Sequence, residues 1–211
     1  MNDVEAIYGQ TDSGMTIIEG NLFLNGQKPI QERTSFGLGE ILNAALDNDA
    51  KHIIISLGGI GSFDGGAGML QALGAKFYDD EANLVDVTKG AHVIKYIRRL
   101  DFSGIHPKLA EANIQVMSDF SSRLYGKQSE IMQMYPMLGM TQNEAAEIDN
   151  LVWYFSELFK SELRVTIGPI ERGGAGGGIA AVLNGLYQAE ILTSHELVDQ
   201  ITHLEDLVQQ A

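Results

Sequence analysis

Short apolar runs of strand length alternate with amphipathic segments along most of the chain. The first two runs, residues 4–9 and 15–19, flank a polar turn that contains Gly14, which predicts a β-hairpin. The runs 53–57 and 113–117 are more continuously apolar and are typical of buried strands. Further short strands are expected over residues 76–78 and 165–168.

Helical spacing of apolar positions predicts four helices, over residues 40–47, 65–73, 141–162 and 194–210. A fifth helix is expected to open at a glycine cluster, residues 173–178, and to run through Leu186. Thr141 and Glu144 have the spacing of a capping box at the start of the third helix. The last helix is expected to face the core, with these residues on one side: Leu197, Ile201, Leu204, Leu207 and Val208.

This alternation of strands and helices indicates an α/β or mixed α+β fold. Residues 82–112 are expected to mix helix and loop. No linker and no internal repeat is visible, so a single domain over residues 1–211 is preferred.

The chain is organised around the stretch 53–69, in which an apolar strand passes through a glycine-rich turn into a helix. Such a turn can bind an anion, because exposed N–H groups and the helix dipole both favour negative charge there. The alternative is a tight corner in which glycine only permits close packing. The pattern leaves both interpretations open.

Two further positions have the same ambiguity. Ser35 precedes an expected helix and could cap it, while Gly37 and Gly39 would let a ligand approach its first turn. Asp119 follows the strand 113–117, where an acidic residue often faces the ligand crevice of an α/β protein. An ordinary cap and a turn aspartate that caps the next segment are the respective alternatives.

Composition excludes several classes of function. The formal net charge of -14 disfavours binding to a nucleic-acid backbone, although it does not exclude small anions. The chain has no cysteine, which rules out disulfides and thiolate chemistry. No apolar run of about 18 residues and no signal-peptide pattern occurs, so no membrane association is expected and a cytoplasmic location is the default.

Familiar catalytic motifs are missing as well. The sequence contains no P-loop of the G-x-x-x-x-G-K-[ST] type, no H-E-x-x-H and no G-x-S-x-G elbow. What remains is two glycine-rich helix entrances and two candidate acids, Asp64 and Asp119. Together they predict a site for a small anionic ligand, with no metal-ligand motif.

Several stretches resemble the bacterial glycerate kinase family. They are Ser35-Phe-Gly-Leu-Gly-Glu40, Leu57-Gly-Gly, Asp64-Gly-Gly-Ala-Gly-Met-x-Gln-Ala-Leu-Gly74, Asp119 and the glycines at 173–178. The resemblance covers nearly the whole chain, in the family's order and spacing. It implies transfer of a phosphoryl group from ATP to glycerate with Mg²⁺, and a small carboxylate substrate. Whether the chain forms a homodimer is left open by the sequence.

The same resemblance implies candidate site residues. Asp64 and Asp119 would be catalytic. The substrate- or phosphate-binding residues would be Ser35, Gly37, Gly58, Gly59, Ser62, Gly65, Gly66, Gly173 and Gly174.

The family's chain is longer and folds as two α/β domains, and the resemblance is to its second domain only. The first domain, which brings an Asp, a Lys and an Arg, would then be absent from residues 1–211, and this chain alone is expected to be inactive. A further segment is expected just after Ala211.

The chain also departs from the family pattern. Ile60 and Phe63 replace Ser and Asn, and Ser122-Arg123 replace Asn-Pro. Met137 and Leu138 stand where the family has Gln and Lys, in a methionine-rich segment expected to fill apolar gaps. These changes favour the alternative of a degenerate, non-catalytic ligand-binding or assembly module.

Overall fold

A five-stranded sheet forms the centre of the computed structural model, which describes residues 8–11, 14–20, 28–59 and 61–202. Its strand order is β1-β2-β3-β6-β7, and all neighbours are parallel except β1, which pairs antiparallel with β2. The strands are β1 (Gly9–Gln10), β2 (Met15–Glu19), β3 (His52–Ser56), β6 (Asn113–Met117) and β7 (Glu190–Leu192). A separate antiparallel pair joins β4 (Lys76–Tyr78) to β5 (Arg99–Asp101).

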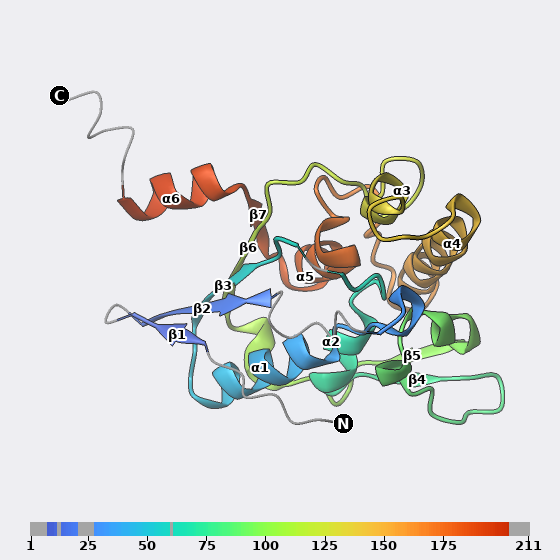
Figure 1. Cartoon of the computed structure of the whole chain (residues 1–211). Coiled ribbons are helices and arrows are strands. Elements are labelled where there is room, and N and C mark those ends of the chain that lie inside the picture. The colour runs from blue at the N-terminus through green and yellow to red at the C-terminus, as the bar shows by residue number, and fades with distance from the viewer. Residues whose placement is uncertain (1–7, 12–13, 21–27, 60, 203–211) are drawn as a thin grey trace.

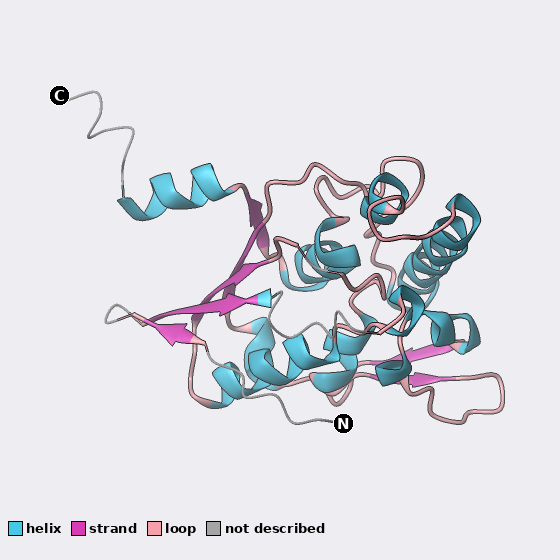
Figure 2. Cartoon of the chain, viewed as in Figure 1, coloured by secondary structure: helices cyan, strands magenta, loops and turns pink. Residues whose placement is uncertain are grey.

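The α-helices are α1 (Phe36–Asp47), α2 (Ala67–Ala72), α3 (Glu130–Met134), α4 (Gln142–Leu158), α5 (Ile179–Tyr187) and α6 (Ser194–Thr202). Short 3₁₀ turns cover Ile30–Glu32, Val87–Lys89, Ala91–Tyr96, Pro107–Ala110 and Ala175–Gly178, and a π-helical turn, Phe159–Leu163, follows α4. Figure 2 shows that much of the remaining chain is loop around α3 and α5.

The two faces of the sheet are covered unequally. Ile53 and Ile55 point into the main core, whereas Ile54, between them on the strand, belongs to a small second cluster with Leu192 and Leu197. Figure 1 shows α1, α2 and α5 gathered on one side of the sheet and α6 on the other. Because strand residues alternate between faces, this arrangement follows from the apolar runs of the central strands.

An aromatic cluster joins the small sheet to α4. Phe77 on β4 lies edge-to-face with Phe155 on α4, with ring centroids 5.8 Å apart, and Phe155 stacks in the same way on Phe159 at 5.0 Å. All three rings are fully buried. Edge-to-face packing of this kind fixes orientation as well as burying area, so α4 is held against the glycine-rich turn that Phe155 also contacts.

The mixed α/β fold predicted from the sequence is confirmed. The capping box is confirmed too, because Glu144 N–H donates to Thr141 Oγ1 at 3.3 Å and Thr141 N–H donates to Glu144 Oε2 at 2.7 Å. The hairpin is present as β1 and β2, although residues 4–7 lie outside the described part of the chain. Among the described residues, no helix combines the length and apolar character needed to cross a membrane.

Two expectations about the fold are wrong, and two short strands were missed. Residues 165–168 form no strand, because Arg164 adopts a left-handed φ of 60° and the chain leaves the helix as a loop without a strand partner. The short strands β5 and β7 were not expected. In α6 only Leu197 is buried, while Ile201 is 50% exposed; Leu204, Leu207 and Val208 lie outside the described residues.

Candidate functional site

Three loops meet beyond the carboxyl ends of the central strands. They are residues 57–59 and 61–66 after β3, residues 118–129 after β6, and the glycine segment 173–178 before α5. Leu57 N–H donates to Met117 O at 2.9 Å, and Gly174 N–H donates to Ser122 O at 3.1 Å. We call this cluster the three-loop site. In open α/β sheets, ligands bind at this edge.

The loops approach each other so closely that only glycine fits at their contacts. A Cβ on Gly177 would lie 1.9 Å from Ser62 O, and one on Gly174 would lie 2.2 Å from Arg123 O. Gly177 also has a left-handed φ of +63°. The second glycine cluster therefore serves mainly to pack the loops together.

Asp64 lies at the centre of the first loop and is fully buried. Its carboxylate accepts hydrogen bonds from Ser35 N–H at 2.7 Å and Ser35 Oγ at 2.9 Å. The N–H groups of Gly66 and Gly68 donate to it at 3.1 Å each, and Thr34 Oγ1 at 3.3 Å. The carboxylate is thus saturated by protein donors, and it ties the start of α1 to the start of α2.

Ser35 does not cap α1 with its side chain, so that interpretation of the sequence is wrong. Its hydroxyl donates to Asp64 and accepts from Met69 N–H at 2.9 Å. The hydroxyl is drawn away from its own helix because the buried carboxylate, a charged acceptor, forms the stronger hydrogen bond. Gly37 is half-buried in the first turn of α1.

The glycines predicted to bind a ligand fall into two groups. The N–H groups of Gly65, Gly66, Gly173 and Gly174 all donate to protein acceptors, and all four residues are buried. By contrast, Gly58 has open space where a Cβ would stand, and Gly59 is exposed with a φ of +72°. The turn directly after β3 is therefore the part of the first glycine stretch that a ligand can reach.

Glu130, at the start of α3, points its carboxylate at the second glycine cluster. Gly177 N–H donates to Glu130 Oε2 at 3.2 Å, and Gly176 N–H donates to the same carboxyl group. Gly176 and Gly177 both adopt left-handed conformations, and their N–H groups are engaged by this side chain of the protein. Burial raises the pKa of Glu130 to about 7, although the two N–H donors oppose the shift.

This raised pKa predicts a pH-dependent loss of stability. In the unfolded chain Glu130 releases its proton near its usual value of 4.5, and in the folded chain near 7. Its contribution to stability is therefore full below pH 4.5 and is lost as the pH rises towards 7, by up to about 3 kcal/mol. Glu130→Gln keeps an acceptor but cannot ionise, so we expect it to be more stable than the wild type at pH 8 and similar at pH 4.5.

Urea unfolding of both proteins across this pH range measures the difference directly. The carboxyl of Asp149, whose pKa burial also raises, is present in both and cancels. Equal pH dependence in the wild type and the Gln variant would show that Glu130 ionises normally in the folded protein.

Asp119 lies exposed just beyond the end of β6. Its Oδ1 accepts from Ser194 N–H at 2.8 Å and from Ser194 Oγ at 2.9 Å, at the first turn of α6. These two bonds, and then the Arg172 guanidinium, lower the pKa of Asp119 below its usual value. In this geometry the carboxylate caps a helix that follows 75 residues later, so Asp119 links the second loop to α6.

The positions at which the chain departs from the family pattern have different environments. Phe63 is a core residue, 2% exposed, whereas Met137 is 82% exposed and so does not fill an apolar gap as expected. Leu138 packs partly buried against the core. Ile60 lies outside the described residues. Ser62, which stands between Ile60 and Phe63 in the sequence, is fully buried, and its Oγ has no hydrogen-bond partner among the described residues.

Three basic residues near the three-loop site were not singled out from the sequence. Arg33 donates to Gly61 O at 3.3 Å and so lies against the first glycine turn. Arg123 and Arg172 line a cavity beside the second and third loops. In the sequence Arg123 stands out only as a departure from the family motif, whereas Arg172 directly precedes the second glycine cluster.

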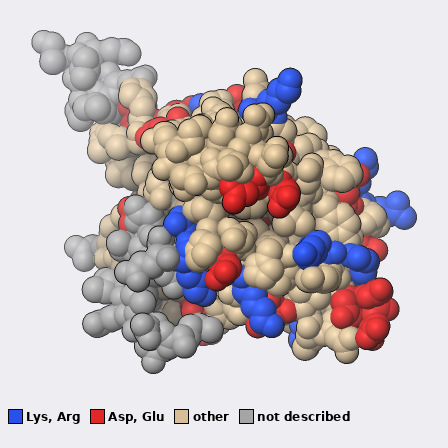
Figure 3. All heavy atoms as spheres, turned by 45° about the vertical axis from the view of Figure 1, so that its right-hand side comes forward, with Lys and Arg blue, Asp and Glu red and all other residues tan. Residues whose placement is uncertain are grey.

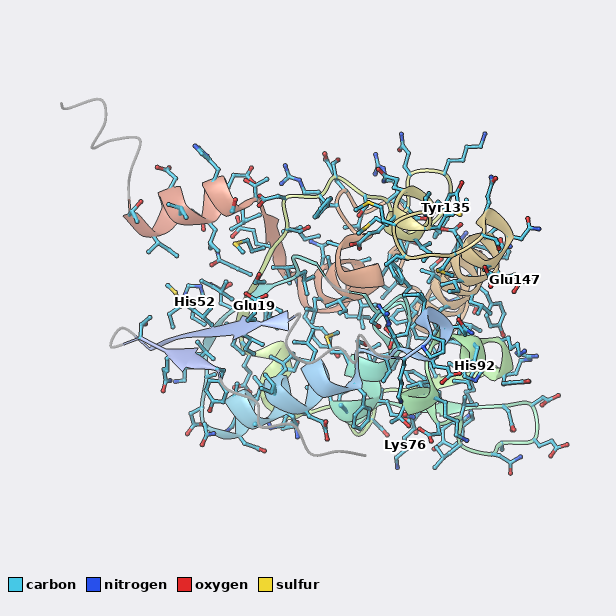
Figure 4. All side chains as sticks on the ribbon, viewed as in Figure 1. Glu19, His52, Lys76, His92, Tyr135 and Glu147 are labelled. Carbon is cyan, nitrogen blue, oxygen red and sulfur yellow. The ribbon has the colours of Figure 1, made fainter. Side chains whose placement is uncertain are left out.

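A second hollow lies elsewhere, among Lys28, Glu32, Asp86, Lys89 and His92. In Figure 4, His92 lies near the small sheet, apart from Tyr135 at the end of α3 and Glu147 on α4. The lining of this hollow carries both acidic and basic side chains, so we assign no chemistry to the hollow.

Comparison with known proteins identifies the family. Residues 2–211 match the Glycerate kinase family. Glycerate 2-kinase of Escherichia coli is 34% identical over 173 residues, which cover 82% of this chain and 45% of that protein. Glycerate kinase of Bacillus subtilis is 29% identical over 215 residues, which cover 99% of this chain and 56% of that protein.

The fold agrees with the same family. The crystal structure of a putative glycerate kinase 2 from Salmonella typhimurium superimposes with a TM-score of 0.87 and 31% identity, over 96% of this chain and 56% of that one. The chain therefore spans about half the length of the relatives it matches. On this evidence the chain belongs to the glycerate kinase family.

Proposed function

We propose that this chain forms part of an ATP-dependent kinase that phosphorylates glycerate or a closely related hydroxy-acid. The observation that carries the proposal is the family match along residues 2–211, together with the three loops at the carboxyl edge of the sheet. In the reaction, a hydroxyl oxygen of the substrate attacks the γ-phosphorus of ATP. The bond from that phosphorus to the bridging oxygen of ADP breaks, and the hydroxyl proton is released.

The three-loop site contributes position rather than proton transfer in this proposal. Gly58 and Gly59 offer backbone that a substrate can approach, and Arg33 supports the turn through Gly61. Asp64 acts as a positioning residue, because its buried carboxylate holds the starts of α1 and α2 together. Phosphoryl transfer depends mostly on positioning and on electrostatic stabilisation. The three-loop site can therefore assist the reaction by positioning the substrate, even without a general base.

ATP and Mg²⁺ enter the proposal from the family alone. The described residues contain no group of three or more His, Asp or Glu side chains that could hold a metal ion, and Asp64 is saturated by protein donors. The described residues therefore form no preformed Mg²⁺ site. None of the roles proposed for these residues depends on binding a metal ion. Asp119 as a catalytic residue stays a prediction from the family motif.

A second candidate function is a non-catalytic ligand-binding or assembly module. It is favoured by the engagement of both candidate acids in structural hydrogen bonds and by the apolar Phe63 inside the first loop. A module of this kind would bind glycerate or phosphoglycerate without turnover.

One pair of measurements separates the two candidates. The complete natural protein that carries this chain is assayed for glycerate-dependent conversion of ATP to ADP, and calorimetry measures the binding of glycerate and of 2- and 3-phosphoglycerate. Turnover supports the kinase. Binding of the same compounds without turnover would overturn the kinase in favour of the module.

A further inference from the structure

A polar cavity of about 200 Å³ lies where the second loop of the three-loop site meets the residues just before the glycine segment. Its lining consists of Ser121, Ser122, Arg123, Gln128, Gln133, Glu171 and Arg172. Every one of these side chains is polar. A cavity of this size holds a small polar group, such as a phosphate or a three-carbon acid, and is too small for a whole nucleotide.

Two arginines face this cavity from different loops. Arg123 donates from one guanidinium nitrogen to Pro169 O at 3.0 Å, and Arg172 from one to Glu196 Oε2 at 3.1 Å. Each of these bonds uses one nitrogen of a group that carries five N–H donors. The guanidinium fork matches the oxygen geometry of carboxylate and phosphate groups. The pair is therefore suited to hold one oxyanion.

The hydroxyl of Ser122 is a second and independent sign of a ligand. Ser122 is 3% exposed, it lines the cavity, and its Oγ has no hydrogen-bond partner among the described residues. A buried polar group without a partner is destabilising, because it has given up its hydrogen bonds to water without replacing them. An oxyanion in the cavity would accept the hydrogen bond that this hydroxyl lacks.

The close contact at Gly174 builds this arrangement. Gly174 N–H donates to Ser122 O, and any Cβ there would lie 2.7 Å from Ser122 Oγ. A larger residue would therefore separate the segment that carries Arg172 from the one that carries Arg123. Arg172 itself adopts a left-handed φ of 56°, a conformation that non-glycine residues rarely hold. The two cations are brought together by close packing.

The two arginines form a local positive site on a chain that is acidic as a whole. The chain has a net charge of -14, and Figure 3 shows acidic and basic side chains in small separate clusters over the visible face. Near the cavity, Glu171 is part of the lining, Glu196 forms a salt bridge with Arg172, and the Asp119 carboxylate also interacts electrostatically with Arg172. Arg123 forms no salt bridge with a described carboxylate, so its charge is available to a ligand.

We propose that the cavity lined by Arg123, Arg172 and Ser122 binds a small oxyanion, the carboxylate or phosphoryl group of a low-molecular-weight ligand. The site does not require kinase activity, because a non-catalytic module would bind the same groups. The site depends on two residues at which this chain departs from the family motif, because Ser122 and Arg123 stand where that motif has Asn and Pro.

Calorimetry on the full chain tests the proposal, with inorganic phosphate and glycerate as separate probes. We expect saturable binding of at least one probe by the wild type, weakened about tenfold in Arg123→Gln, because the variant loses a charge-assisted hydrogen bond to the oxyanion. Ser122→Ala should also weaken binding, yet keep or increase the melting temperature without ligand because it removes an unpartnered hydroxyl. Arg99→Gln is the matched control. Arg99 lies on β5 over the Tyr78 ring, outside the cavity lining, and should bind like the wild type.

The two probes distinguish the source of the oxyanion. Binding of phosphate alone identifies a phosphoryl pocket, and binding of glycerate alone a carboxylate pocket; both outcomes support the proposal. Absence of binding to either probe at 10 mM, a concentration about ten-thousandfold above a 1 μM dissociation constant, would overturn it. Equal affinities in the wild type, Arg123→Gln and Ser122→Ala would overturn it as well.

Discussion

Replacing Asp64 by alanine should destabilise the folded chain by about 3–5 kcal/mol. The change leaves the N–H groups of Ser35, Gly66 and Gly68 buried without their acceptor. Each buried N–H group that loses its acceptor destabilises the folded state, because bulk water does not reach a fully buried site. Urea unfolding of the wild type and the variant measures the loss.

A matched pair separates a positioning role for Asp64 from a chemical one. Asp64→Asn keeps the shape but turns an amide towards N–H donors, so stability and ligand binding should fall together. Asp119→Ala, which removes an exposed cap, should lose far less stability. A stable Asp64→Asn protein with normal glycerate binding but no turnover would contradict the positioning role and favour catalysis.

Gly177→Ala should be among the most damaging single substitutions in the chain, at more than about 3 kcal/mol. The new methyl group would lie 1.9 Å from Ser62 O, and the residue would also be forced to a φ of +63°. The obstacle is backbone rather than a flexible side chain, so the first and third loops must separate. The free energy of unfolding and the fraction of folded protein at 25 °C check this directly.

Gly126→Ala is the control, because Gly126 has a φ of +88° but nothing within 4 Å of a Cβ. It should lose only the cost of the left-handed conformation, about 1–2 kcal/mol. If the two variants were equally destabilised, backbone conformation alone would explain the glycine at 177, and the close contact of the loops would be of no consequence.

The sequence predicted those elements whose structure depends on neighbouring residues along the chain. The strand, glycine turn and helix around residues 53–69 were predictable, because strand character and helix entry are properties of neighbouring residues. The strands β5 and β7 have three residues each, too few for a period to appear, and they depend on their partners β4 and β6.

The candidate site was less predictable, because its contacts join residues far apart in sequence. Asp64 was identified, but its partner Ser35 lies 29 residues away, and nothing in the pattern showed that protein donors would saturate the carboxylate. Glu130 reaches Gly177 across 47 residues and was not foreseen. Glycine clusters mark a close approach of the backbone, and sequence alone does not say whether a ligand or another loop makes that approach.

If the three loops at the carboxyl edge of the sheet form one ligand-binding surface, a single bound molecule should perturb all three together. Backbone NMR of the full chain, titrated with glycerate, measures this. We predict shifted amide signals at Gly58 and Gly59, at residues 121–123 and at residues 172–178, with saturation at a common concentration. Shifts confined to the hollow around His92, or separate saturation of the three loops, would show that the loops do not form one binding surface.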